Sequence, residues 1–265
     1  MPKLCLAFAC ALAALVGVAE VSAQDTGKKN VRTSLVLKTR VNPGGGKPQL
    51  KFPRKRFYLF RGGWDVNKAL ADRIEAAPYT SRDCFYCTQK ASPEYISWLR
   101  AADCESPYCR EISADDVVKV PEFATAYKKG LVAFKNKPDL ARSWVTTNMP
   151  GGLRDGYYLQ KKKVVDGVLA GTKPEATVMT DSGNLQAIFI DIMLGEKDSQ
   201  KFLVTNLVPF EVGDKAYLWV CEVDVKASPS IFTLPANSTK TKDQAKICDV
   251  IVRELPKCTG GGCSQ

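Results

Sequence analysis

The sequence predicts a mainly β protein, a seven-stranded antiparallel β-sandwich interrupted by a helical insertion that disulfides pin. Three observations carry this prediction. Short runs of strand-like hydrophobicity lie near both ends of the chain, and a block with helical spacing separates them. Eight of the ten cysteines follow residue 23. An even number of cysteines is typical of disulfides in an exported protein.

Residues 1–23 have the pattern of a secretory signal. Lys3 supplies the positive start, an apolar run extends from Leu4 to Ala19, and Val21-Ser22-Ala23 places small residues where a signal peptidase cuts. The apolar run is short for a spanning helix, which needs about 20 residues, and Glu20 interrupts it. The sequence therefore predicts an exported protein, periplasmic or secreted, with no transmembrane span after signal removal.

The expected strands form two groups. Before the helical block lie 34–41, with Leu35, Leu37, Thr39 and Val41 on one face, and 54–60. After it lie 175–180, 185–192, 201–205, 215–225 and 245–254. Strands from both groups must pair to complete one sandwich. Residues 24–64 and 171–255 are therefore predicted to form one domain that hosts the insertion, and 256–265 a flexible tail rich in Cys and Gly.

The insertion, residues 65–170, shows helix signals along its length. Val66, Leu70 and Ile74 recur at spacings of four, and Ser92-Pro93 supplies an N-cap and a first-turn proline for a helix up to Ala102. Ser113 to Asp116 resembles a capping box. Two further helices are expected over 121–134 and 138–144.

The eight cysteines fall into two groups. Cys221 and Cys248 lie in expected strands, which favours a bridge between strands, and the last two could close a small loop in the tail. In the insertion, a nested pairing of Cys87 with Cys104 and Cys84 with Cys109 would pin both ends of the helix at 92–102. The eight candidates for disulfides are Cys84, Cys87, Cys104, Cys109, Cys221, Cys248, Cys258 and Cys263.

Two other interpretations of residues 84–109 remain open. The spacing C-x2-C followed by C-x4-C resembles a four-cysteine zinc module, although the second gap is wide. Cys84-Phe85-Tyr86-Cys87 also has the spacing of a redox motif, but no thioredoxin-like context surrounds it. Thr88 stands where c-type haem attachment requires histidine.

The chain carries a net charge of +10. Basic runs occur at Arg54-Lys55-Arg56, Lys128-Lys129 and Lys161-Lys162-Lys163. In an exported protein, a positive charge of this size favours binding to an acidic surface polymer, a carbohydrate, anionic lipid or an acidic protein. The sequence contains no RNA-binding motif, so a nucleic acid is not expected as a partner. The alternative is a solvated surface that keeps the protein soluble.

The chain contains no histidine. This excludes Ser-His-Asp and Cys-His triads and histidine-ligated metals, and no cofactor or metal is expected. A hydrolase of surface polysaccharide that uses two carboxylates is still possible, with Asp115 and Asp116 or Asp181 and Asp191 as candidates. Their structural alternatives are charge at a helix N-terminus and a hairpin turn.

Exposed aromatic side chains are better candidates for binding than any acid. The candidates are Tyr86, Tyr95, Trp98, Tyr157 and Tyr158, which could form a platform for sugar or peptide. The alternative is that they form the small core of the insertion.

The segment from Thr180 onward resembles carboxypeptidase-regulatory-like, transthyretin-type sandwich domains. The resemblance rests on the turn Thr180-Asp181-Ser182-Gly183, a strand with Ile188-Phe189-Ile190, the segment Asn206-Leu207-Val208-Pro209, and the strand Tyr217-Leu218-Trp219-Val220. It covers about half of the chain after the signal and does not extend to the insertion. It implies a sandwich fold and a non-enzymatic role as a binding or structural module on an exported protein.

Overall fold

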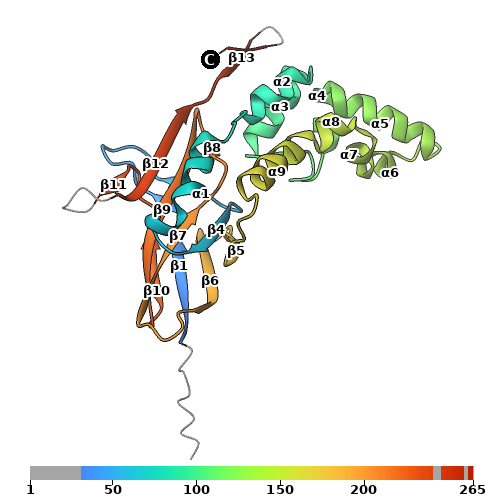
Figure 1. Ribbon diagram of the computed structural model, residues 1–265. Coiled ribbons are helices and arrows are strands. Elements are labelled where there is room, and N and C mark those ends of the chain that lie inside the picture. The colour runs from blue at the N-terminus through green and yellow to red at the C-terminus, as the bar shows by residue number, and fades with distance from the viewer. Residues whose placement is uncertain (1–30, 241–245, 260–261, 265) are drawn as a thin grey trace, which may run out of the picture.

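The computed structural model describes residues 31–240, 246–259 and 262–264, so the predicted signal lies outside the described residues. Two packed sheets form an elongated β part, and a helical arm projects sideways from one end of it (Figure 1). The arm consists of α2 to α8 and the N-terminal half of α9. No helix in the described ranges is long and apolar enough to cross a membrane.

The larger sheet provides the framework of the β part. Its strands β11-β12-β9-β7-β4-β5 pair in that order, and β8 pairs with β9. All its pairings are antiparallel. The bounds are β4 Arg56–Arg61, β5 Ala176–Met179, β7 Ser199–Thr205, β8 Phe210–Val212, β9 Lys215–Lys226, β11 Thr239–Lys240 and β12 Lys246–Glu254.

The smaller sheet has the order β10-β1-β6, with bounds Ser230–Thr233, Arg32–Lys38 and Gln186–Met193. Here β1 pairs with β10 in parallel, in contrast to the all-antiparallel sheet that the sequence predicts. One short antiparallel pair, β2 (Arg40–Val41) with β3 (Leu50–Lys51), lies beside the two sheets.

One apolar core lies between the two sheets. The expected inward face of the first strand is confirmed, since Leu35, Leu37, Thr39 and Val41 are fully buried. From the larger sheet, Phe57, Phe202 and Trp219 join Leu35, Leu37 and Phe189 in this core; its further members include Leu59, Val204 and Val223. Burial of this much aromatic and aliphatic surface is the main source of stability in the β part.

The opposite face of the larger sheet packs against two helices. Because side chains alternate along a strand, Tyr58, Leu203 and Leu218 point away from the smaller sheet. They contact Leu70 and Ile74 of α1 (Trp64–Ala76), and Val168 of α9 (Gly156–Val168) joins the same cluster. Thus α1 and the end of α9 lie within the predicted insertion but pack on the β part.

The arm has its own small core. Tyr86, Tyr95, Trp98, Phe123 and Tyr157 are buried together there. Ser81, Ser92 and Ser113 cap α2, α3 and α4, and the capping box at Ser113 is complete. The helices are α2 Arg82–Thr88, α3 Pro93–Ala101, α4 Ala114–Lys119, α5 Pro121–Ala133, α6 Pro138–Ser143, α7 Val145–Asn148 and α8 Gly151–Arg154.

All eight candidate cysteines form disulfides, but the predicted nested pairing is wrong. Cys84 pairs with Cys263 and Cys87 with Cys258, whereas Cys104 pairs with Cys109. The tail forms a hairpin, β13 (Lys257–Thr259) with β14 (Gly262–Ser264), which the first two bridges tether to α2. Cys258 and Cys263 face each other in this hairpin, but they bond to the arm and not to each other.

The expected bridge between strands is confirmed, because Cys221 of β9 pairs with Cys248 of β12 and the two residues are register partners. The mainly β class is too narrow. Within the described residues, helices and strands take up similar shares of the chain, so the fold is a mixture of antiparallel sheets and helices. The helices missing from the prediction are α2, the short α7 and α8, and α9.

Candidate functional site

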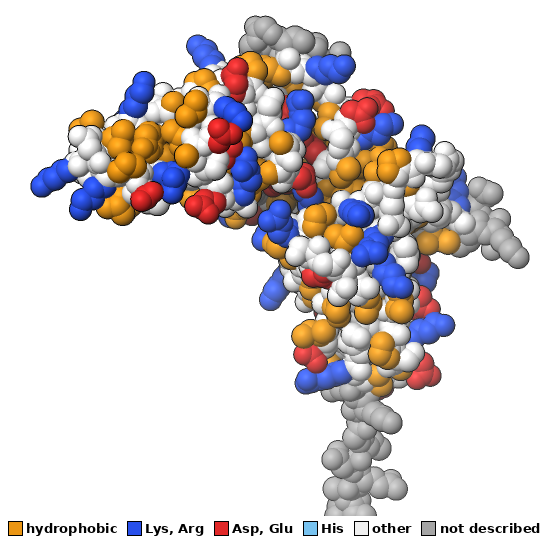
Figure 2. Space-filling view, turned by 180° about the vertical axis from the view of Figure 1, so that it is seen from behind, with side chains coloured by type: hydrophobic (Ala, Val, Ile, Leu, Met, Phe, Trp, Pro, Cys, Tyr) orange, Lys and Arg blue, Asp and Glu red, His pale blue; other side chains and the backbone are white. Residues whose placement is uncertain are grey.

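A groove of about 480 Å³ lies where the arm meets the β part. Its walls come from segments far apart in sequence: the turn before β4, strand β5, and one face of α9. Lys and Arg side chains gather in this inner angle (Figure 2). The lining includes Arg54, Lys55, Arg56, Tyr58, Glu105, Tyr158, Lys161, Lys162, Val165, Asp166, Met179 and Phe210.

The groove therefore brings together two basic runs that the sequence separates by about a hundred residues. Lys55 pairs with Asp103 at 3.0 Å, Lys161 with Glu105 at 2.6 Å, and Lys162 with Asp166 at 2.6 Å.

The remaining two cations of the groove, Arg54 and Arg56, have exposed side chains. Neither guanidinium forms an ion pair with any residue that the structure describes. Three of the five cations that line the groove thus pair with carboxylates, and the guanidinium groups of Arg54 and Arg56 pair with none among the described residues.

Backbone hydrogen bonds fix the turn that carries these arginines. Arg54 has a positive φ of 52°, which a non-glycine residue adopts only when its surroundings hold it there. Thr180 holds the turn: its hydroxyl donates to the carbonyl of Phe52 at 2.6 Å and accepts from the backbone of Lys55 at 2.8 Å. The backbone N–H of Arg54 donates to the carbonyl of Thr180 at 3.1 Å. The guanidinium groups therefore extend from a fixed backbone.

Glu105 organises the opposite wall. Burial alone would raise the pKa of its carboxyl, but the ammonium groups of Lys161 and Lys55 lower it below the ordinary value. The carboxylate therefore stays ionised at neutral pH and holds Lys161 in place. Lys161 also lies 5.7 Å from the centre of the Tyr157 ring, which is one turn earlier on the same helix. The pairing with Glu105 therefore connects this face of α9 to the loop after α3 in the arm.

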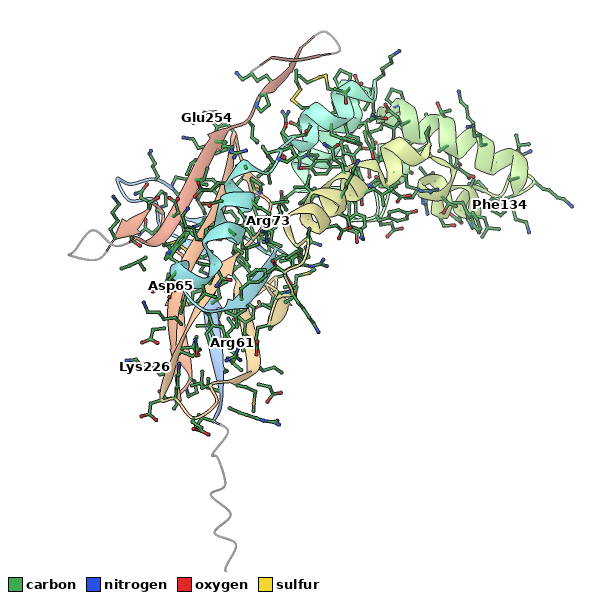
Figure 3. The ribbon with its side chains drawn as sticks, in the orientation of Figure 1. Arg61, Asp65, Arg73, Phe134, Lys226 and Glu254 are labelled. Atoms are coloured by element: carbon green, nitrogen blue, oxygen red, sulfur yellow. A yellow bond between two sulfur atoms is a disulfide. The ribbon has the colours of Figure 1, made fainter. Side chains whose placement is uncertain are left out.

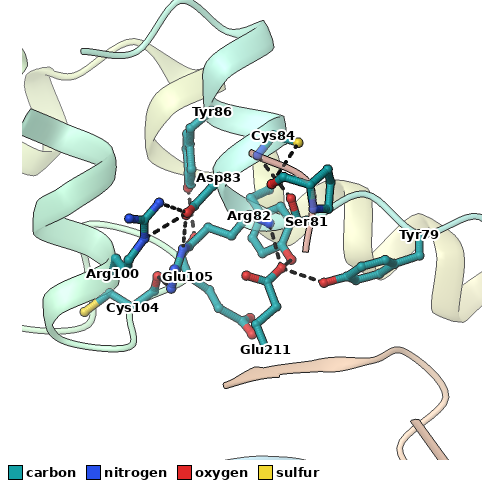
Figure 4. A network of polar contacts seen from close by, with 12 residues as sticks. Tyr79, Ser81, Arg82, Asp83, Cys84, Tyr86, Arg100, Cys104, Glu105 and Glu211 are labelled. Atoms are coloured by element: carbon teal, nitrogen blue, oxygen red, sulfur yellow. Dashed lines mark hydrogen bonds and ion pairs between the residues drawn. The ribbon is translucent and has the colours of Figure 1, made fainter. Parts of the chain in front are cut away.

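Glu211 of β8 connects the β part to the arm through hydrogen bonds (Figure 4). We call this region of contact between the two parts the joint. Its Oε1 accepts hydrogen bonds from Tyr79 Oη at 2.8 Å, the backbone N–H of Arg82 at 2.7 Å, and Tyr157 Oη at 3.0 Å. Burial, followed by the charge of Glu211, raises the pKa of Tyr79 and Tyr157 well above the ordinary value. Both hydroxyls thus remain donors over the whole physiological pH range.

A second set of contacts lies on the arm side of the same joint. The buried guanidinium of Arg82 donates to Asp83 at 3.0 Å and to the carbonyl of Cys104 at 3.2 Å. Arg100 donates to the other oxygen of Asp83. Tyr86 Oη donates to the carbonyl of Glu105 at 2.8 Å, which links this network to the groove wall. The joint has the polar, multiply bonded character that sets a defined angle between two bodies.

Four of the five aromatic candidates do not lie on a surface. Tyr86 and Tyr95 are fully buried, and Trp98 and Tyr157 are 6% and 2% exposed. They form the core of the arm, where the hydroxyls of the three tyrosines bond to carbonyl or carboxylate oxygens and the Trp98 ring packs on Phe123. Only Tyr158, which is 53% exposed, reaches the groove.

The four acidic candidates have structural partners. Asp116 closes the capping box of α4, and Asp115 pairs with Lys119 one turn later. Asp181 accepts hydrogen bonds from the backbone N–H groups of residues 183–186, which shape the turn between β5 and β6. Asp191, at a positive φ of 55°, lies 3.9 Å from Arg32.

The arm cysteines are committed to three disulfides, so Cys84, Cys87, Cys104 and Cys109 do not form a four-thiolate set. The described residues contain no cluster of three or more groups that could hold a metal ion.

The sequence analysis identified the basic runs but did not predict that they lie in one groove. It also did not identify Glu211 as a functional or structural residue. A single carboxylate between Phe210 and Val212 in an apolar segment was the available signal for a buried partner. The meeting of the basic runs was hidden because α9, which carries the second run, was not predicted as a helix.

Comparison with known proteins gives no relative: no family model, curated protein or solved structure matches the chain significantly.

Proposed function

We propose that the protein is a non-enzymatic binding module that holds an acidic surface polymer, an acidic carbohydrate, in the basic groove at the joint. The observation that carries this proposal is the pair of unpaired guanidinium groups of Arg54 and Arg56 on a fixed turn. Arginine binds carboxylate and sulfate groups through two parallel hydrogen bonds, and two arginines on one turn favour a ligand with more than one anionic group.

The other groove residues support the same ligand class. Tyr158 presents an exposed ring beside the cations, as in sites that stack a sugar face, and Tyr58 and Phe210 supply an apolar floor. Lys161 and Lys162 are already paired but add positive potential that steers an anionic chain toward the groove.

The proposal includes an exported β-sandwich as the scaffold. The shared apolar core of the two sheets and four disulfides support it. A kinship with transthyretin-type domains would add a spacer role, in which the β part carries the arm and groove away from an attachment point.

The test is binding to heparin and to polygalacturonate, with uncharged dextran as the negative probe, measured by calorimetry at two ionic strengths. Arg54→Ala/Arg56→Ala should weaken binding of the anionic polymers about tenfold and reduce the salt dependence. Neither arginine is buried, so the double variant should keep the fold.

The matched control is Lys38→Ala/Lys226→Ala, which removes two exposed cations from strands outside the groove. Equal loss of affinity in both double variants would mean that binding follows net charge and not this groove. Absence of binding to either anionic polymer at low ionic strength would end the proposal.

A further inference from the structure

The far end of the arm exposes a patch of apolar side chains surrounded by lysines. It is formed by the end of α5, the loop to α6, and Trp144 after α6, and Phe134 lies at its extremity (Figure 3). Val132 is 83% exposed, Trp144 47% and Leu140 44%. Figure 2 shows hydrophobic side chains across this end with Lys or Arg at the rim. We call residues 128–144 the arm tip.

The arm tip is a rigid helical hairpin. Gly130 allows α5 and α6 to pack closely, because a Cβ at this position would lie 3.0 Å from the Cα of Ala141. The loop turns through positive φ at Lys135 and Asn136, and the N–H of Asn136 bonds to the carbonyl of Leu131 at 2.8 Å.

The rings of the arm tip are ordered too. Phe134 and Trp144 contact each other with ring centres 5.4 Å apart, so the exposed tryptophan is held in place. Leu140 lies one helical turn before Trp144 and shares its side of the helix.

The charge of the arm tip is strongly positive. Residues 128–144 contain four lysines, one arginine and one aspartate, so the net charge is +4. Arg142 pairs with Asp139 at 3.1 Å. Lys128, Lys129, Lys135 and Lys137 are exposed and form no ion pair with the described residues.

We propose that the arm tip docks on an anionic lipid bilayer, with Trp144, Val132 and Leu140 in the head-group region. The arm tip combines an exposed tryptophan and aliphatic side chains with a rim of lysines. These two kinds of side chain match the apolar interface and the anionic head groups of a bilayer. Apolar groups enter the interface, while lysines bind the anionic head groups. An acidic polysaccharide would satisfy the lysines but leave the aliphatic side chains in water.

This inference is independent of the groove. The patch and the groove lie at opposite ends of the arm, and the groove lining includes no residue of 128–144. A protein bound through its arm tip would keep the groove free for its own ligand.

The test is co-sedimentation of the whole protein with vesicles of phosphatidylcholine, alone and mixed with phosphatidylglycerol. Binding is expected only to the mixed vesicles. Lys135→Ala/Lys137→Ala should weaken it roughly 25-fold, since each lysine near an anionic surface contributes about fivefold. Trp144→Ala/Val132→Ser should weaken it at least tenfold, and Trp144 fluorescence should be quenched by brominated lipid.

Three controls separate the possible outcomes. Ile190→Ser/Ile231→Ser removes apolar groups that are 67% and 65% exposed on the smaller sheet, and Arg54→Ala/Arg56→Ala alters the groove; both should bind vesicles as the wild type does. Absence of vesicle binding, or equal loss in these controls, would overturn the proposal. So would self-association that the Trp144 variant abolishes, because the patch would then bind a second copy.

Discussion

The β part and the arm are stabilised by different means. The core between the sheets is built from aliphatic side chains and Phe or Trp rings, with one disulfide between adjacent strands. The arm core is built around three tyrosines, whose hydroxyls bond to Glu105, Leu153 and Glu211. Three of the four disulfides involve the arm, and two of these leave it for the C-terminal hairpin.

The difference follows from size. A large pair of sheets buries enough apolar area to be stable with little help, whereas a small helical body does not. The arm compensates with directional hydrogen bonds at the joint and with covalent links that restrict its unfolded state. The stability of the arm should therefore depend more on redox state and polar contacts than the stability of the β part, which has one disulfide between strands.

The strongest test of this contrast removes the two tethers through Cys84→Ala/Cys87→Ala/Cys258→Ala/Cys263→Ala. These bridges span 179 and 171 residues. The first bridge to form lowers the entropy of the unfolded chain, which stabilises the folded protein by about 5 kcal/mol. We expect the free energy of unfolding of the arm to fall by about that amount. Hydrogen exchange measured by mass spectrometry should show lost protection in α2 to α8 and intact protection in β7 and β9.

The matched control is Cys104→Ala/Cys109→Ala, which opens a bridge of sequence separation 5 within the arm. Its smaller loop should contribute only about 2 kcal/mol. Equal effects of the two variants, or loss of protection spread evenly over both regions, would contradict the contrast.

A second test removes the acceptor at the joint. Glu211→Ala leaves the hydroxyls of Tyr79 and Tyr157 and the N–H of Arg82 without their partner, and we expect about 3 kcal/mol of destabilisation in urea unfolding. Glu111→Ala, an exposed carboxylate elsewhere in the arm, should change stability by less than about 0.5 kcal/mol. Similar values for the two would show that the joint is not a stabilising contact.

The smallest expected effect is a pH dependence. The pKa of Glu105 is lowered in the folded protein, so its ion pair stabilises the arm above the ordinary carboxyl value of 4.5 and is lost as pH falls below it. Urea midpoints from pH 7 to pH 3 should decline less steeply for Glu105→Gln than for the wild type. Glu94→Gln, exposed on α3, should keep the wild-type slope. A wild-type slope in Glu105→Gln would contradict this role.

Sequence patterns predicted the strands better than the helices. Seven expected strands correspond to β1, β4, β5, β6, β7, β9 and β12 within a few residues. In β1 buried and less buried side chains alternate, whereas β4, β7 and β9 contain apolar runs that are buried on both faces of the larger sheet. The parallel pairing of β1 with β10 was not predictable, since β10 has only four residues and its register depends on tertiary packing.

The helix α9 shows why the site was harder to predict. Its apolar residues serve two different cores, Tyr157 the arm and Val168 the β part, so no single stripe appears in the sequence. Its lysines look like a solvated run until the fold places them opposite Arg54 and Arg56. The disulfide pairing likewise depends on where the C-terminal hairpin docks, which spacing alone does not encode.

The tethering of α2 to the last hairpin has a consequence for biosynthesis. Ribosomes add about 5 to 20 residues per second, so roughly 9 to 36 seconds pass between the synthesis of Cys84 and Cys87 and that of Cys258 and Cys263. During that interval the next cysteines along the chain are Cys104 and Cys109, the partners in the nested pairing that the folded protein does not contain. The yield of correctly paired protein would then depend on a thiol isomerase, or on conditions that keep these thiols reduced. A chain that ends before Cys258 would have an arm without its two disulfides to the C-terminal hairpin.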